Sequence, residues 1–258
     1  MKLEGRTSII TGGGRGLGRA IALRFASEGA SLVLSGTTED AITATAKEIR
    51  ANGGRAIGIR ADVAEESEVE ALVAAALDEF GRIDILVNNA GIIGPTAPVV
   101  QIERQEWDRT LAVNLTGAFL CVKHALPHMI ERRSGRVLNI TSVAGLIGYN
   151  LRSAYAVSKW GMIGLTRTLA IEAGRYDITV NAIAPGPVKG PRMDAVIRLR
   201  AESMGKPASE VEDEYVQPIA LKRMVEEEDV ASTALFLASD DGRNITGETI
   251  TVSGGYPL

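Results

Sequence analysis

Tyr155 and Lys159 are the two side chains whose types and spacing most directly suggest chemistry. They stand four residues apart in the run Tyr-Ala-Val-Ser-Lys, which places them on one face of a helix, a single turn apart. A phenol with an ordinary pKa of about 10 is a poor base at neutral pH, but a neighbouring ammonium favours the phenolate and lowers that pKa. Tyr155 could then protonate the alkoxide of a ketone under reduction or deprotonate an alcohol under oxidation. The spacing alone also fits a tyrosine and a lysine that merely share a helix surface.

A glycine-rich segment at residues 11–18 could bind phosphate. It reads Thr-Gly-Gly-Gly-Arg-Gly-Leu-Gly and joins a strand-like run to the helical pattern of residues 19–28. Glycines let the backbone approach a pyrophosphate closely, and the free N–H groups of a helix N-terminus attract its charge. A P-loop would need Lys followed by Ser or Thr where Arg19 and Ala20 stand, and the G-x-G-x-x-G pattern lacks its last glycine here. A tight strand-to-helix turn without a ligand is the alternative.

The elements that must position these residues follow a regular alternation of short apolar runs and helix-length segments. We predict strands at residues 8–11, 31–35, 56–60, 83–87, 136–141, 179–184 and 249–252. Apolar strands separated by helices indicate a parallel sheet covered on both faces, a doubly wound Rossmann-type α/β fold of about seven strands. Ligands of such sheets bind outside the carboxyl ends of the strands, so we expect the site at that edge.

No linker divides the chain, so residues 1–258 are predicted to form a single dinucleotide-binding catalytic domain. One segment breaks the alternation, since residues 185–221 hold five prolines and dense mixed charge. We interpret residues 187–221 as a substrate lid with one or two helices; a solvated connection is the alternative.

Further motifs follow in order along the chain. Residues 88–91 read Asn-Asn-Ala-Gly, Asn114 lies in Val-Asn-Leu-Thr-Gly, Ser142 follows the fifth predicted strand, and residues 185–186 read Pro-Gly. Together with the T-G-x-x-x-G-x-G loop and the Y-x-x-x-K pair, they resemble the short-chain dehydrogenase/reductase family over essentially the whole chain. The resemblance implies that Asn114, Ser142, Tyr155 and Lys159 are catalytic. In that family the Ser hydroxyl holds the substrate oxygen, and the Asn, in a distorted helix, holds a water in a proton relay to the Lys.

The resemblance also implies a nicotinamide cofactor and assigns its contacts. The Lys159 side chain should bind the nicotinamide ribose, Asp62 and Val63 the adenine ring, and the loop at residues 11–18 the diphosphate. The full set of expected cofactor contacts is Gly12, Arg15, Gly16, Leu17, Gly36, Thr37, Asp62, Val63, Asn89, Ala90, Gly91, Tyr155, Lys159, Pro185, Gly186 and Val188. One departure is Gly190, which stands where many members have a Thr that binds the carboxamide.

The end of the second predicted strand favours NADP(H) over NAD(H). An acid there would bind the adenosine ribose and repel a 2'-phosphate, but the sequence reads Ser-Gly-Thr-Thr at residues 35–38. Gly36 leaves room, Thr37 can donate a hydrogen bond, and Arg15 could supply positive charge. Glu39 and Asp40 are close enough in sequence to keep NAD(H) open.

We therefore predict an oxidoreductase that transfers hydride between NADP(H) and a carbonyl or secondary alcohol, for example a reductase of 3-oxoacyl thioesters or other ketones. The alternatives are an NAD-dependent sugar, polyol or hydroxy-acid dehydrogenase, a non-redox enzyme on the same scaffold, and a non-catalytic nucleotide-binding protein. Expected substrate contacts are Ser142, Ala144, Tyr149, Leu151 and Tyr155. Lys189 and Arg192, at the root of the lid, raise the hypothesis of an anionic substrate; ordinary surface charge is the alternative.

Composition narrows the partners. Among 258 residues, 45% are hydrophobic and the formal net charge is -4, which argues against nucleic acid or an anionic membrane surface as the main partner. No run of about 18 apolar residues exists, so we expect a cytoplasmic protein. We expect the lone Cys121 in the core and no metal site, because the two histidines lack a ligand motif. The segments 111–129 and 154–173 are apolar on more than one stripe and have surface left to bury. Members of the family that the chain resembles bury these helices between subunits, so the resemblance implies a homotetramer.

Overall fold

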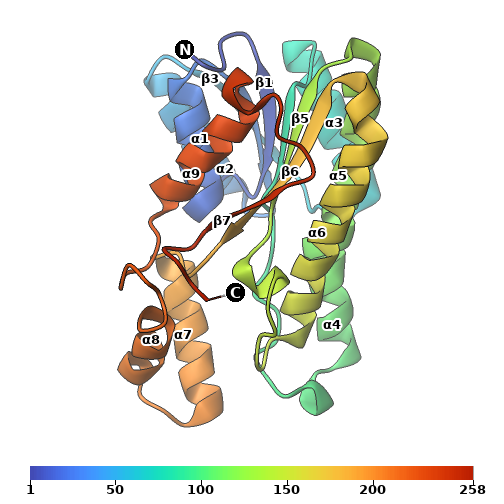
Figure 1. Ribbon diagram of the computed structural model, residues 1–258. Coiled ribbons are helices and arrows are strands. Elements are labelled where there is room, and N and C mark those ends of the chain that lie inside the picture. The colour runs from blue at the N-terminus through green and yellow to red at the C-terminus, as the bar shows by residue number, and fades with distance from the viewer. Residues whose placement is uncertain (258) are drawn as a thin grey trace.

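A seven-stranded, wholly parallel sheet forms the centre of the computed structural model, which describes residues 1–257 (Figure 1). The strand order is β3-β2-β1-β4-β5-β6-β7, so the chain returns past β1 between β3 and β4 and leaves a crevice between β1 and β4. The strands are β1 (Thr7–Thr11), β2 (Ser31–Gly36), β3 (Arg55–Arg60), β4 (Ile85–Asn88), β5 (Gly135–Ile140), β6 (Ile178–Pro185) and β7 (Thr249–Val252). All seven predicted strands and the doubly wound fold are confirmed.

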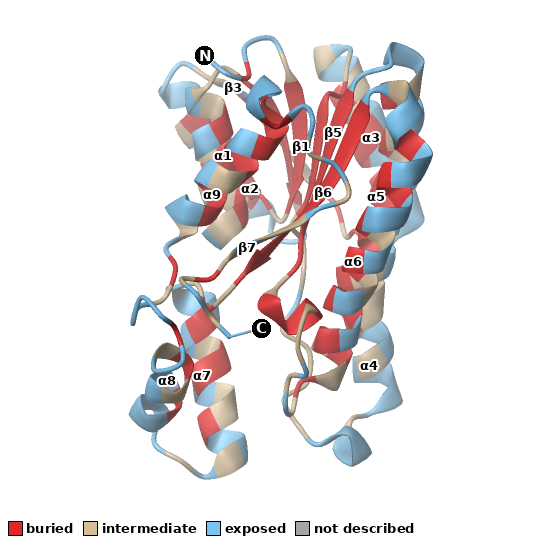
Figure 2. Cartoon of the chain, viewed as in Figure 1, coloured by how far each residue is buried: buried red, intermediate tan, exposed pale blue. Residues whose placement is uncertain are grey.

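Helices cover both faces of the sheet. They are α1 (Gly16–Ser27), α2 (Glu39–Ala51), α3 (Glu66–Phe80), α4 (Arg104–Leu111), α5 (Gly117–Arg132), α6 (Ser153–Ala173), α7 (Pro191–Met204), α8 (Ala208–Val216) and α9 (Glu227–Ala238). Neighbouring strand residues point to opposite faces: Ile10 packs in a core with α1, α2 and α9, while Ile9 packs in a second core with α3, α5 and α6. This explains why the central strands are buried along their length (Figure 2).

The fourth strand begins two residues later than predicted. The Asp84 carboxylate accepts a hydrogen bond of 2.8 Å from the Thr7 amide and one of 2.7 Å from Arg82 Nε. Asp84 therefore anchors the start of β1, and ladder pairing in β4 begins only at Ile85.

The segment predicted as a lid holds α7 and α8, which pack on each other below the carboxyl ends of the strands, opposite α4 and the start of α6 (Figure 1). Met193, Ile197, Val211 and Tyr215 form the small core between these two helices and contact the partly buried Tyr149. The one or two helices predicted here are present; their role as a lid stays a prediction.

The segment predicted as one apolar helix at residues 111–129 is divided. A π-helical turn at Ala112–Thr116 separates α4 from α5, whereas the second predicted helix appears as α6. Cys121 is buried in α5 as expected, and burial raises the pKa of its thiol to about 12. Within residues 1–257, none of the helices is both long and apolar enough to span a bilayer.

Candidate active site

The glycine loop is shaped for close approach of its own backbone and of a ligand. Gly12 has a φ of +67°, and a Cβ on Gly18 would collide with the carbonyl oxygen of Gly12. No side chain caps the N-terminus of α1 that follows, so its first N–H groups are left for a ligand to bind. This cradle fits the diphosphate of a dinucleotide.

Side-chain hydrogen bonds fix the loop after β4 against β1. The Thr11 hydroxyl accepts hydrogen bonds of 3.0 Å from the amides of Asn89 and Ala90, and Asn89 Nδ2 donates to the Thr11 carbonyl at 2.8 Å. Asn88 Nδ2 reaches Asn139 Oδ1 on β5 at 2.9 Å. The amides of this motif brace adjacent strands, as the family resemblance implies.

The residues expected to meet the adenosine follow β2 and β3. Gly36 ends β2 and Thr37 follows it, while the Asp62 carboxylate is held by Arg109 at 2.6 Å and by the amide of Ala64 at 3.0 Å. Burial raises the pKa of Asp62, but these two hydrogen bonds and the positive charge of Arg109 outweigh it, so the pKa lies below its usual value. Asp62 is therefore ionised and held in place by these contacts.

Lys159 is held at the carboxyl end of β5. Its side chain, 3% exposed, donates a hydrogen bond of 2.8 Å from Nζ to the carbonyl of Ile140. Nζ lies 5.7 Å from the centre of the Tyr155 ring. Burial disfavours the ammonium and lowers the pKa of Lys159 to about 8, although the neighbouring phenol works in the opposite direction.

The pKa of Tyr155 is set by effects that oppose each other. Burial raises the pKa of its phenol and is the largest single effect, but the charges of Lys159 and Arg192, a hydrogen bond with Ser142 and the charge of Arg152 together bring the pKa below 10. Tyr155 therefore gives up its proton more readily than an ordinary tyrosine.

Ser142 stands at the start of a short turn that packs on α6. A Cβ on Gly145 would lie 2.8 Å from the carbonyl oxygen of Lys159, so the turn can approach the helix only with glycine there. The Ser142 hydroxyl accepts a hydrogen bond of 3.2 Å from the amide of Ala144. This bond directs the hydroxyl beside Tyr155 at the end of β5.

Asn114 lies in the π-helical turn before α5. Its Oδ1 accepts a hydrogen bond of 2.8 Å from the Ile92 amide, and its Nδ2 donates to Ser158 Oγ at 3.2 Å. A Cβ on Gly91 would lie 3.2 Å from Asn114 Oδ1 and 3.8 Å from Lys159 Nζ. The helix distortion expected from the resemblance is thus present, and all four expected catalytic residues gather around one point; their individual roles stay predictions.

The residues expected near the nicotinamide follow β6. Pro185 ends that strand, and a Cβ on Gly186 would lie 2.9 Å from the Ser253 Cα. Val188 pairs with Val225 in an isolated bridge. This segment leads directly into the N-terminus of α7.

The two lid cations are separated by the structure. Lys189 has a side chain 72% exposed, with Nζ 3.9 Å from Glu226 Oε1. Arg192 instead extends to the site, where Nη1 donates a hydrogen bond of 2.7 Å to the carbonyl of Gly91.

Arg152 is a residue of the site that sequence reasoning missed. It is 4% exposed, and its guanidinium carbon lies 4.9 Å from the centre of the Tyr155 ring. The expected substrate contact Tyr149 is next to it and donates a hydrogen bond of 3.0 Å to the Tyr215 hydroxyl on α8. The only signal in the sequence was a basic residue three positions before Tyr155.

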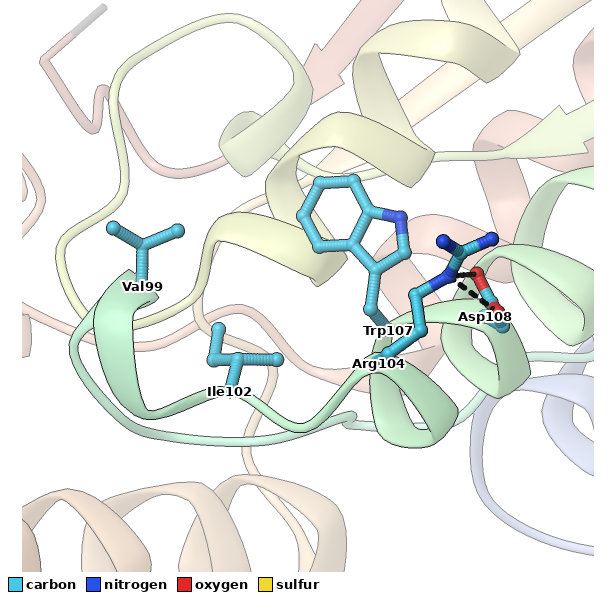
Figure 3. Close-up of a pocket in the computed structure, with 5 residues that line it drawn as sticks. All are labelled: Val99, Ile102, Arg104, Trp107 and Asp108. Atoms are coloured by element: carbon cyan, nitrogen blue, oxygen red, sulfur yellow. Dashed lines mark hydrogen bonds and ion pairs between the residues drawn. The ribbon is translucent and has the colours of Figure 1, made fainter.

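A surface hollow of about 490 Å³ near α4 has no set of ionisable side chains comparable to that around Tyr155 (Figure 3). Its lining residues are Val99, Ile102, Arg104, Trp107 and Asp108. Arg104 and Asp108 form an exposed ion pair with each other, at 2.6 Å, so neither is left to act on a ligand. Among residues 1–257, no group of three His, Cys, Asp or Glu side chains could hold a metal ion.

Comparison with known proteins agrees with this geometry. Residues 12–257 match the family model described as enoyl-(acyl carrier protein) reductase. The chain is 38% identical over 251 residues to the 3-oxoacyl-[acyl-carrier-protein] reductase of Staphylococcus epidermidis, covering 97% of this chain and 98% of that protein.

Two solved structures superpose on the chain. The crystal structure of levodione reductase has a TM-score of 0.94 and 37% identity and covers 98% of both chains. That of NAD⁺-bound xylitol dehydrogenase has a TM-score of 0.96 and 32% identity, over 99% of this chain and 100% of the other. The chain therefore belongs to the short-chain dehydrogenase/reductase family and is an NAD(P)-dependent oxidoreductase of carbonyl and alcohol groups.

Proposed function

We propose that this protein reduces a ketone to a secondary alcohol with NADPH, and that Tyr155 donates the proton. The observation that carries the proposal is the phenol of Tyr155 held beside the buried ammonium of Lys159 at the carboxyl edge of the sheet. The nicotinamide, when bound, supplies the hydride that reaches the carbonyl carbon.

Ser142, Lys159 and Asn114 each have a separate role in the proposed reaction. The Ser142 hydroxyl holds the carbonyl oxygen next to Tyr155 Oη, which releases its proton to that oxygen. The Lys159 ammonium stabilises the phenolate left behind. Asn114, fixed by Ile92 and Ser158, positions the water from which the proton is replaced.

Preference for NADPH rests on the surroundings of Gly36. A Cβ on Gly14 would lie 2.8 Å from the Ile42 amide, so the glycine loop packs directly on the first turn of α2. Arg15 follows in the same loop, and we infer that its guanidinium binds the 2'-phosphate. Arg15 has no ion-pair partner among residues 1–257.

The named relatives support the substrate class without fixing it. A 3-oxoacyl thioester or another ketone is the first candidate, because the Staphylococcus relative is a 3-oxoacyl-[acyl-carrier-protein] reductase. An NAD-dependent sugar, polyol or hydroxy-acid dehydrogenase is the second, favoured by Glu39 and Asp40 in the first turn of α2 and by the likeness to NAD⁺-bound xylitol dehydrogenase.

The decisive experiment compares initial rates with NADPH and NADH over a panel of ketones, 3-oxoacyl thioesters, sugars and polyols. We expect ketone reduction with a preference for NADPH. Gly36→Asp should reverse this preference, because a carboxylate repels the 2'-phosphate and a Cβ there meets only Ile42 Cγ2, at 3.3 Å. Arg15→Gln should weaken it. Oxidation of polyols with NAD⁺ at a higher rate than any ketone reduction would support the second candidate instead.

We further propose a homotetramer, located in the cytoplasm. Phe119 on α5 and Trp160 and Ile171 on α6 are exposed, and large apolar side chains of this kind are commonly buried between subunits. A lone cysteine suits a reducing compartment. Light scattering at micromolar concentration tests the assembly: a monomer would contradict it, and Trp160→Glu should dissociate it.

A further inference from the structure

Positive charge accumulates around Tyr155 without a negative partner. Arg152, Lys159 and Arg192 all act electrostatically on the phenol. None of the three forms an ion pair with a carboxylate among residues 1–257. Lys159 is used by the proposed mechanism, but the mechanism has no task for the two arginines.

Arg152 is placed where a cation is costly. It is 4% exposed and occupies the N-cap position of α6, at the positive end of that helix. Nη2 donates a hydrogen bond of 2.8 Å to the carbonyl of Ile93, but the buried Nε has no hydrogen-bond partner. Buried charges in proteins are ordinarily paired, and among residues 1–257 the only other compensation of this guanidinium is its position over the Tyr149 and Tyr155 rings, so an anion beside it would offset the excess positive charge.

Arg192 is the accessible member of the pair. It extends from the first turn of α7, and one of its five N–H groups donates to Gly91. Gly91 in turn lies against Asn114 and Lys159, so the guanidinium is within the catalytic centre with most of its donors free for a ligand. Arg192 and Arg152 also repel each other electrostatically, which an anion between them would relieve.

The cofactor diphosphate is not the anion that Arg152 and Arg192 would bind. The Glu227 carboxylate lies 3.5 Å from the Cβ position of both Gly16 and Gly190, so the side of the lid root that faces the diphosphate loop is already occupied by negative charge. Arg192 is turned instead toward Gly91, on the side of Tyr155.

We propose that Arg192, with Arg152 behind it, binds a carboxylate of the substrate, so that the ketone reduced at Tyr155 belongs to an oxo acid. This inference rests on the proposed function. Because Arg152 packs on the Tyr155 ring and Arg192 binds the Gly91 carbonyl beside Lys159, we expect the carboxylate to lie close to the reacting carbonyl. The substrate class is therefore 2-oxo or 3-oxo acids.

The experiment compares each of several 2-oxo and 3-oxo acids with its methyl ester, which stands for neutral ketones and thioesters. Reduction is followed with NADPH in the wild type, Arg192→Met, Arg192→Lys and Arg152→Met. We expect the wild type to favour the acids in kcat/KM by about 10- to 100-fold, the worth of a charged hydrogen bond. Arg192→Met should abolish this ratio and Arg192→Lys restore part of it. Lys189→Met, the neighbouring cation paired with Glu226, is the matched control and should keep the ratio.

Direct titration of acid and ester into the NADPH-loaded protein by calorimetry gives the same comparison without turnover. If neither compound is reduced and Tyr155→Phe behaves as the wild type, the proposed function fails, while tighter binding of the acid that is lost in Arg192→Met still supports this inference. Equal binding of acid and ester would overturn the inference. So would an Arg192→Met variant that binds NADPH more weakly but still prefers the acid to the ester.

Discussion

Buried charge is paired at the amino edge of the sheet and left without a charged partner at the carboxyl edge. At the amino edge, the buried Asp84 carboxylate receives hydrogen bonds from the Thr7 amide and from Arg82, and Arg132 is 3.8 Å away. At the carboxyl edge, Lys159 and Arg152 are equally buried, yet each has only a backbone carbonyl as a hydrogen-bonding oxygen partner.

This difference separates charges that serve the fold from charges that serve the reaction. Asp84 is neutralised where it lies, so its ion pair and hydrogen bonds offset much of the cost of burying it. The cations at the carboxyl edge are left uncompensated, and the resulting potential is what lowers the pKa of Tyr155. Stability is given up at one edge to make a phenol reactive.

The largest effect is expected from Tyr155→Phe, which removes the group that this potential acts on. Without the hydroxyl, no proton can reach the substrate oxygen from this position, so kcat should fall by about 100- to 10,000-fold. Cofactor affinity should change far less than kcat, and the thermal midpoint should stay near the wild-type value. Stopped-flow reduction and NADPH fluorescence measure the two separately, and a variant that retains more than a tenth of kcat would show that the proton comes from elsewhere.

Removing the ammonium tests the cost of uncompensated charge through its pH dependence. The folded protein releases the Lys159 proton near pH 8, whereas the unfolded chain keeps it until about its ordinary value of 10.5. Between these values the unfolded chain binds more protons, so the free energy of unfolding should rise with pH, by at most about 3 kcal/mol. The lowered pKa of Tyr155 acts in the same direction.

Lys159→Met should remove this rise, and urea titrations from pH 7 to about pH 10 would reveal it. A wild type whose stability relative to Lys159→Met is flat over this range would mean that the ammonium is not penalised by burial.

The amino edge should respond in stability instead of activity. Asp84→Ala leaves the Thr7 amide and Arg82 without their acceptor, and we expect the free energy of unfolding to fall by about 2 kcal/mol, less than for a fully buried pair because Arg82 is 37% exposed. Asp84→Asn keeps an oxygen for Thr7 and should cost about half as much. Both variants should keep kcat per folded molecule, and a loss of kcat at constant stability would erase the distinction between the edges.

Local signals in the sequence were sufficient for most of this picture. The strands were predictable because each is a short apolar run between helical patterns, and the glycine loop, Ser142 and the Tyr155–Lys159 pair were predictable because their motifs are contiguous. Even the start of β4 was missed by only two residues, since the partner that delays it, Thr7, is 77 positions from Asp84.

The surplus charge at the carboxyl edge was not predictable in the same way. The buried Arg152 donates a hydrogen bond to the carbonyl of Ile93, 59 positions away, and Arg192 donates one to the carbonyl of Gly91, 101 positions away. Nothing in their neighbours distinguished Arg192 from Lys189, two lid cations three positions apart. Only the contact between α7 and the loop after β4 distinguishes the cation in the site from the one in solvent.

The smallest effect concerns backbone strain, which is present at both edges. Leu151, in the loop that carries Tyr149 and Arg152, has a φ of +63°, a conformation that a branched side chain adopts at a cost of about 1–2 kcal/mol. Leu151→Gly should therefore raise the free energy of unfolding by about 0.5–1 kcal/mol, after the extra entropy of glycine in the unfolded chain is deducted.

Because the carbonyl of Leu151 holds the Ala97 amide at 3.0 Å, relaxing this turn should also loosen Arg152 and lower kcat/KM by a few-fold. Arg133, at the end of α5 with a φ of +49°, is the matched position at the amino edge. Arg133→Gly should change stability by a similar or smaller amount and leave kcat/KM as it is. Equal kinetics in the two glycine variants would show that the strain at Leu151 does nothing for the site, and that only charge distinguishes the two edges.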